Sequence, residues 1–202
     1  MTKPFVFALV AVSACAPAIA GEFTYEELNI SMSTADDWAT LSETALAIIN
    51  QHASRSTIMH ANRLGIKLNA DQAGSEILLL QSKLPFGSNA DNPNVLLAIE
   101  KAWSDTFDRT GKGYLDLMAD RVKKLAAPTG FISEAKELNI GENVFYYADA
   151  ENTKVLNAKT KQRYICGFVN GHYLYFVLSY NDENDNDFSQ MMACVKSLTV
   201  GR

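Results

Sequence analysis

The stretch that decides the fold is Arg163-Tyr-Ile-Cys-Gly-Phe-Val-Asn-Gly-His-Tyr-Leu-Tyr-Phe-Val-Leu-Ser-Tyr180, near the end of a chain of 202 residues. Its centre is Asn170-Gly171, a dipeptide that accepts the positive φ angles of a type I′ turn. The residues on both sides are mostly aromatic or aliphatic, with several β-branched, a composition that strands favour. The stretch therefore predicts a β-hairpin in which Val169 faces His172 and Cys166 faces Tyr175.

Alternate residues of a strand share one face of the sheet, so the hairpin has two predicted faces. One face carries Cys166, Phe168, Tyr173, Tyr175 and Val177, and the other carries Ile165, Leu174, Phe176 and Leu178. Both are largely apolar, which is typical of a sheet that is covered on both sides, and helices are the expected cover.

An acidic segment, residues 181–187, follows the hairpin and leads into a predicted helix. Its apolar residues fall at i, i+3, i+4 and i+7, namely Phe188, Met191, Met192 and Val195. Asp187 with Gln190 three residues later predicts a capping-box start. This helix is one candidate to cover the hairpin.

The rest of the chain alternates short strands and helices. Strands are predicted over 28–33, 76–84, 94–100, 131–137 and 143–148, and helices over 41–52, 57–64 and 114–126. Thr40 and Glu43 form a predicted capping box for the helix over 41–52. Short links between strands favour antiparallel pairing, so the predicted fold class is α+β, an antiparallel sheet with helices on both faces.

The first 20 residues are typical of a signal peptide. Lys3 is their only charge, residues 5–12 are apolar, and Ala18-Ile19-Ala20 precedes Gly21 as a cleavage sequence. Val12-Ser-Ala-Cys15 offers an alternative, since it resembles a lipobox whose cysteine would carry a lipid. The predicted mature protein is therefore one domain over 21–202, periplasmic or secreted, or alternatively a lipoprotein anchored at Cys15.

Composition sets limits on partners. The net charge is −5, and removal of Lys3 makes it −6. Such a mildly acidic chain lacks the basic surface that nucleic acids and anionic lipids select. No stretch after the leader is apolar and long enough for a transmembrane helix.

Two cysteines remain after the leader, Cys166 and Cys194. An even number in an exported chain favours a disulfide, which would tie the last helix to the hairpin. Two buried thiols are the alternative.

No familiar catalytic or metal-binding pattern is present. The three histidines, His52, His60 and His172, lack the spacing of a zinc site. No Gly-x-Ser-x-Gly occurs, and the segment from Asp182 departs from a calcium loop at its sixth and twelfth positions. We predict no catalytic residue, metal or cofactor. The predicted function is therefore that of a non-catalytic module that binds another envelope protein, which the sequence does not identify. The alternative is a small-molecule carrier or sensor, with Tyr164, Tyr173 and Tyr175 as its candidate binding face, and a hydrolase ranks third.

Several short patterns resemble the PsbP-like superfamily, which includes the extrinsic photosystem II subunit, a small Ran-binding protein and DcrB-type bacterial envelope proteins. They are Ile30-Ser-Met-Ser, Asp37-Trp38, Asn92-Pro-Asn-Val, Tyr114-Leu115, Ile140-Gly141, the strand from Gly171 to Tyr180, and Val195-Lys-Ser-Leu. The resemblance implies an α/β/α sandwich around an antiparallel sheet. It also implies a binding or accessory module with no common catalytic site.

Overall fold

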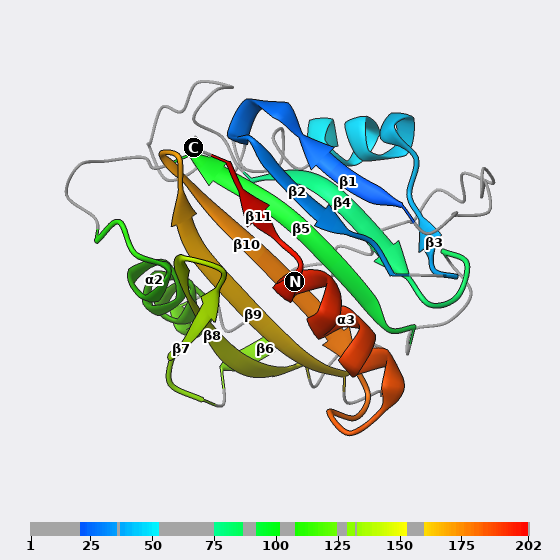
Figure 1. Cartoon of the computed structure of the whole chain (residues 1–202). Helices are drawn as coiled ribbons and strands as arrows, with labels where there is room; N and C mark the ends of the chain where they lie inside the picture. Colours follow the sequence, from blue (N-terminus) through cyan, green and yellow to red (C-terminus); the bar gives the residue numbers. More distant parts are fainter. Residues whose placement is uncertain are drawn as a thin grey trace.

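A large antiparallel sheet forms the centre of the molecule (Figure 1). The computed structural model describes residues 21–35, 37–52, 75–86, 92–101, 108–124, 129–131, 133–152 and 160–201. The strand order is β3-β4-β5-β10-β9-β8-β6, and β7 pairs with β8 beside β6. The strands are β3 (Ala39–Thr40), β4 (Glu76–Ser82), β5 (Asn94–Lys101), β6 (Thr129–Phe131), β7 (Lys136–Ile140), β8 (Asn143–Asn152), β9 (Thr160–Val169) and β10 (His172–Tyr180).

The predicted hairpin is confirmed, and it lies at the middle of this sheet. Strands β9 and β10 pair in the predicted register, with Val169 opposite His172 and Cys166 opposite Tyr175. Asn170 has φ 46° and Gly171 has φ 85°, as the two-residue turn requires. β10 also pairs with β5, and β9 pairs with β8, so neither hairpin strand is an edge.

A second, three-stranded sheet has the order β1-β2-β11. It consists of β1 (Glu22–Tyr25), β2 (Ile30–Ser33) and β11 (Thr199–Val200), with the short helix η1 (Glu26–Leu28) between the first two. The predicted strand over 28–33 corresponds to β2. The two outer strands were not predicted; for β11 the reason is that a run of two residues is too short for a periodic pattern to stand out.

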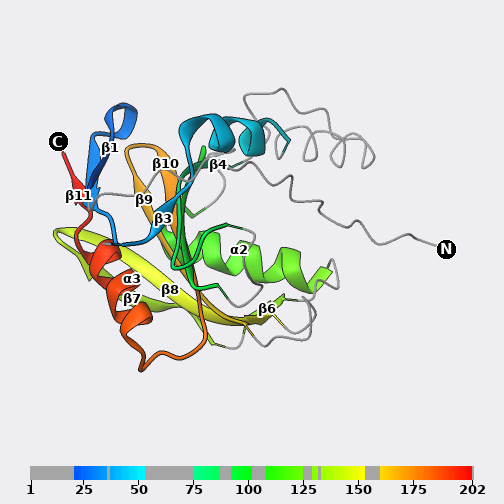
Figure 2. The same ribbon diagram turned by 90° about the vertical axis from the view of Figure 1, so that its right-hand side faces the viewer.

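Both sides of the large sheet are covered, one by α3 (Asn186–Lys196) together with the small sheet and the other by α2 (Gly111–Lys124) (Figure 2). α3 and the small sheet share a buried cluster with Ile165, Leu174 and Phe176. α2 lies on the other side against β8 and β9. The architecture is α+β as predicted, although part of the cover on the α3 side is a sheet and not a helix.

α3 buries the predicted stripe but begins differently. Phe188, Met191 and Val195 are buried, while Met192 is half-buried. The predicted capping box at Asp187 and Gln190 is wrong. The carboxylate of Asp185 accepts a hydrogen bond from the Phe188 backbone N–H at 2.7 Å and is the N-cap.

The helix over residues 43–52 is also capped at a different residue, two positions after the predicted cap Thr40. Thr40 lies in β3, and the Ser42 hydroxyl accepts from the Ala45 N–H at 3.4 Å. Near the helix end, the Asn50 amide bonds both backbone groups of Ile77, at 2.9 and 3.0 Å. The helix thereby satisfies backbone groups on the outer side of β4, a common protection for exposed strands. The predicted helix over 57–64 lies outside the described residues.

Candidate functional site

The predicted binding face lies on the α2 side of the large sheet and is partly filled by that helix. Tyr173 is buried, whereas Tyr164 and Tyr175 are half-buried. The ring of Tyr114, from α2, stacks on Tyr173 with centroids 4.7 Å apart and on Tyr175 at 5.6 Å. These contacts place Tyr173 in the packing of the fold, and ligand binding by Tyr164 and Tyr175 stays a prediction.

A buried carboxylate sits among these tyrosines. Glu100, near the end of β5, is 6% exposed, and its Oε2 accepts from the Tyr114 hydroxyl at 2.6 Å and from the Ser75 hydroxyl at 3.3 Å. Glu100 was not among the predicted site residues. Its burial could have been predicted, because Glu100 directly follows the apolar run of residues 95–99 and shares the face of Ala98 by strand alternation.

Burial raises the pKa values of the tyrosines and of the cysteine in this cluster. Burial, together with the charge of Glu100, raises the pKa of Tyr114 far above its usual range. Burial likewise raises the pKa of Tyr175 to about 12, with further contributions from Glu100 and Cys166 and an opposing one from Ser75. Burial also raises the pKa of the Cys166 thiol, so this cysteine stays protonated and is a poor nucleophile.

The raised tyrosine pKa values predict a loss of stability in alkali. An unfolded tyrosine loses its proton near pH 10, whereas folded Tyr175 keeps it until about pH 12. Stabilisation by this proton is therefore complete below pH 10 and is lost between pH 10 and 12. Each such tyrosine should make the free energy of unfolding fall by about 1.4 kcal/mol per pH unit there. Urea titrations from pH 9 to 11.5 should give a shallower decline for Tyr175→Phe than for wild type. Parallel declines would contradict the assignment.

The predicted disulfide between Cys166 and Cys194 is wrong in this structure. Neither cysteine is in a disulfide. Cys166 belongs to the α2-side cluster with Tyr114, while Cys194 belongs to the α3-side cluster with Ile165. Adjacent residues of β9 point to opposite faces, so the sheet separates the two thiols. The prediction placed the last helix on the wrong face of the hairpin relative to Cys166.

At one end of the large sheet, two connections lie close together. Ser82 and Ser179 flank Asn94 in neighbouring strands, so the β4–β5 and β10–α3 connections leave the sheet at the same end. Lys83 and Asp187 join them with an ion pair at 3.1 Å. We name residues 83–86 and 181–187 together the loop end.

Leu84 is exposed at the loop end although its backbone is fixed. Its side chain is 44% exposed. The Asn92 amide bonds both the N–H and the C=O of Leu84, each at 2.8 Å, and the Ser82 hydroxyl donates to the same carbonyl at 2.6 Å. An apolar side chain is thus presented to solvent on an ordered turn.

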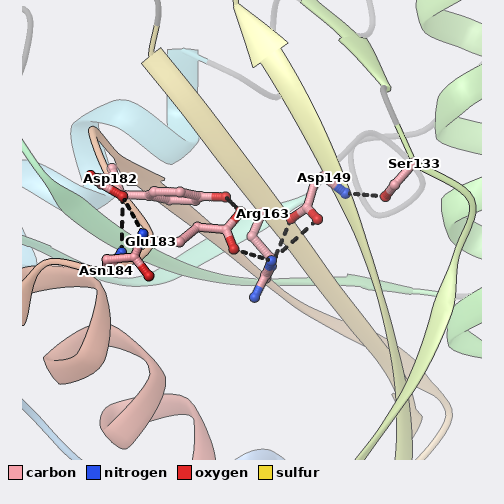
Figure 3. Close-up of polar contacts among 7 residues, drawn as sticks. Ser133, Asp149, Arg163, Asp182, Glu183 and Asn184 are labelled. Carbon is pink, nitrogen blue, oxygen red and sulfur yellow. Dashed lines mark hydrogen bonds and ion pairs between the residues drawn. The ribbon is translucent and has the colours of Figure 1, made fainter.

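Arg163 connects the loop end to the interior of the sheet (Figure 3). Its guanidinium donates to both carboxylate oxygens of Asp149, at 2.7 and 3.2 Å, and lies 3.5 Å from Glu183. The rings of Tyr147 and Phe188 lie 4.7 and 5.0 Å from it. Burial alone would lower the pKa of Arg163, but the bond to Asp149 outweighs it and the pKa is raised. Sequence analysis missed this pair, because Asp149 and Arg163 meet only through the β8–β9 register.

The acidic loop, residues 181–185, has its own internal bonds. The Asn184 N–H and side-chain amide donate to the Asp182 carboxylate at 3.0 and 3.2 Å, and the backbone contact holds the pKa of Asp182 below its usual range (Figure 3). The Tyr180 hydroxyl donates to Glu183 at 3.1 Å. The loop is therefore an ordered turn that carries exposed carboxylates.

The two histidines that the structure describes lie outside the loop end. His52 is exposed at the end of the helix over 43–52, and His172 contacts the Asn170 carbonyl at 3.1 Å. Cys15, Ala20 and His60 lie outside the described residues, and Gly21 is hydrogen-bonded to Thr34 at the start of the small sheet.

Within the described ranges, no three His, Cys, Asp or Glu side chains gather as a metal site requires. None of the described helices has the length and hydropathy to cross a bilayer.

Comparison with known proteins bears on the fold. No protein-family model and no curated protein matches the chain in sequence. The solution structure of cyanobacterial PsbP (CyanoP) from Synechocystis sp. PCC 6803 matches it in three dimensions, with a TM-score of 0.55 over 94% of this chain and 99% of that one. The fold is PsbP-like. The sequence identity is 13%, so the PsbP-like fold is what the two chains share.

Proposed function

We propose that this chain is an exported, non-catalytic accessory module of PsbP-like fold, which binds another protein through its loop end. The observation that carries the proposal is the exposed Leu84 side chain on a backbone fixed by Asn92 and Ser82. Binding through an ordered group costs little conformational entropy. Burial of an exposed apolar side chain against a partner removes apolar surface from water and so favours association.

Charge around Leu84 defines the chemistry of the partner. Asp182 and Glu183 are exposed on the acidic loop, and Asp187 lies at the ion pair with Lys83. Opposite charge across an interface speeds association and excludes wrong partners. The proposed partner is therefore a protein segment with an apolar side chain flanked by basic residues.

Export is part of the proposal and rests on the leader sequence, while the likeness to DcrB-type envelope proteins rests on the short patterns that resemble the superfamily. Intact mass of the protein from the native envelope tests export. A chain that begins at Gly21 supports the periplasmic or secreted form, while a lipid adduct on Cys15 supports the anchored form. A chain that retains residues 1–20 without a lipid would contradict export by either route.

Leu84→Ser is the variant that tests partner binding. Crosslinking in the native envelope, followed by capture through a C-terminal tag, should recover at least about tenfold less partner from this variant, as loss of a central apolar contact implies. Ile48→Ser is the matched control, because Ile48 is 46% exposed and Leu84 is 44% exposed. Equal recovery from the two variants, both folded, would contradict binding at the loop end.

A further inference from the structure

We infer that the acidic loop acts as a strap within the loop end. The ion pair between Glu183 and Arg163 holds the strap closed, and the strap can open while Arg163 stays bound to the sheet through Asp149. The inference rests on the proposed function for its biological meaning, because an open strap would change the surface that the partner meets. Opening of the acidic loop is a property of this chain alone.

Arg163 holds its two carboxylate partners very unequally. Asp149 is bonded through two atoms, at 2.7 and 3.2 Å, and both side chains are largely buried, at 13% and 16% exposure. Glu183 has a single contact at 3.5 Å and is 45% exposed. Two parallel bonds to a planar guanidinium are the stronger arrangement. Loss of the Glu183 contact therefore leaves Arg163 bound to Asp149 and packed between the rings of Tyr147 and Phe188.

The acidic loop keeps its own shape without Glu183. Asp182 accepts two bonds from Asn184, and Asp185 caps α3 through the Phe188 N–H. The Glu183 side chain contributes to none of these bonds; it contacts Arg163 and the Tyr180 hydroxyl. The side chain that attaches the loop to the sheet is thus different from the side chains that order the loop.

Salt is the expected trigger of opening. The charged groups near the Glu183 contact are Arg163 from β9 and Asp149 from β8, with Asp182 and Asp185 on the loop itself. Salt screens an exposed pair more than a buried one, so the Asp149 pair should remain.

Relaxation dispersion of backbone amides in residues 181–185 tests the strap on the mature protein without any partner, since it detects exchange on the μs–ms timescale. Glu183→Gln should raise the open population by up to about fivefold, the equivalent of an exposed ion pair. The Arg163 Nε–H resonance should stay in place in this variant and shift in Asp149→Asn. Asp116→Asn is the control, because it removes an exposed ion pair from α2 and should leave the loop unchanged.

Two results would overturn the strap. One is an unchanged open population in Glu183→Gln. The other is an equal rise in opening on addition of salt in wild type and in Glu183→Gln, because only wild type carries the exposed charge that salt screens. A failure to capture a partner would contradict the proposed function but not the strap, because relaxation dispersion is measured without a partner.

Discussion

Trp38→Ala is expected to lower the free energy of unfolding by about 4 kcal/mol, near the upper end for truncation of a core residue. Trp38 has 0% exposure and packs in the α3-side cluster. Its indole N–H donates to Gln190 at 3.0 Å, and Lys83 lies over its ring at 5.9 Å. Truncation leaves a cavity and an unpaired Gln190 amide, and it removes the ring that joins α3 to the β4–β5 connection.

Urea unfolding of the purified mature protein gives the measurement. Trp38→Phe should lose less than Trp38→Ala, because it keeps most of the packed volume and gives up only the bond to Gln190. Ile48→Ala, at an exposed position, should change stability by less than about 0.5 kcal/mol. A loss of the same small size in Trp38→Ala would show that the ring does not hold the core together.

Gly111→Ala is expected to cost about 3 kcal/mol or more. Gly111 is the first residue of α2 and is buried against β9. A Cβ at this position would collide with the backbone carbonyl of Cys166. Overpacking of a core ordinarily costs about 1–3 kcal/mol, and here the colliding atom is backbone and cannot rotate away, so the helix and strand must separate.

The sign of this effect is diagnostic. At an exposed helix position, glycine to alanine would raise stability by about 1 kcal/mol. Lys112→Ala, at the adjacent exposed residue, loses only an ion pair with Asp116 and should leave stability nearly unchanged. Stabilisation by Gly111→Ala would contradict the close packing of α2 on β9. If the variant does not fold, the soluble yield relative to Lys112→Ala gives the same answer.

The sequence was most informative where local rules and tertiary contacts agree. The Asn170-Gly171 turn sets the register of β9 and β10, and that register places every residue of the hairpin on its face. The stripe of α3 was predictable for the same reason, because helical period and burial coincide at Phe188, Met191 and Val195. The α+β class follows from these two elements and the short links between strands.

The sites depend on contacts that no local pattern encodes. Arg163 meets Asp149 through strand pairing, and Glu100 meets Tyr114 through the docking of α2. The disulfide prediction failed for a related reason. Spacing and cysteine number say nothing about which face of the sheet receives α3, and that choice places Cys194 on the side away from Cys166.

Site-specific photocrosslinking in the native envelope tests whether the loop end binds a partner protein. A photoreactive residue in place of Leu84 should capture one dominant protein, and the crosslink should map to a segment with basic side chains. The same probe in place of Ile48, which is equally exposed on the helix over residues 43–52, should not capture that protein. Capture of the same protein from both positions, or from position 48 alone, would contradict the loop end as the binding surface.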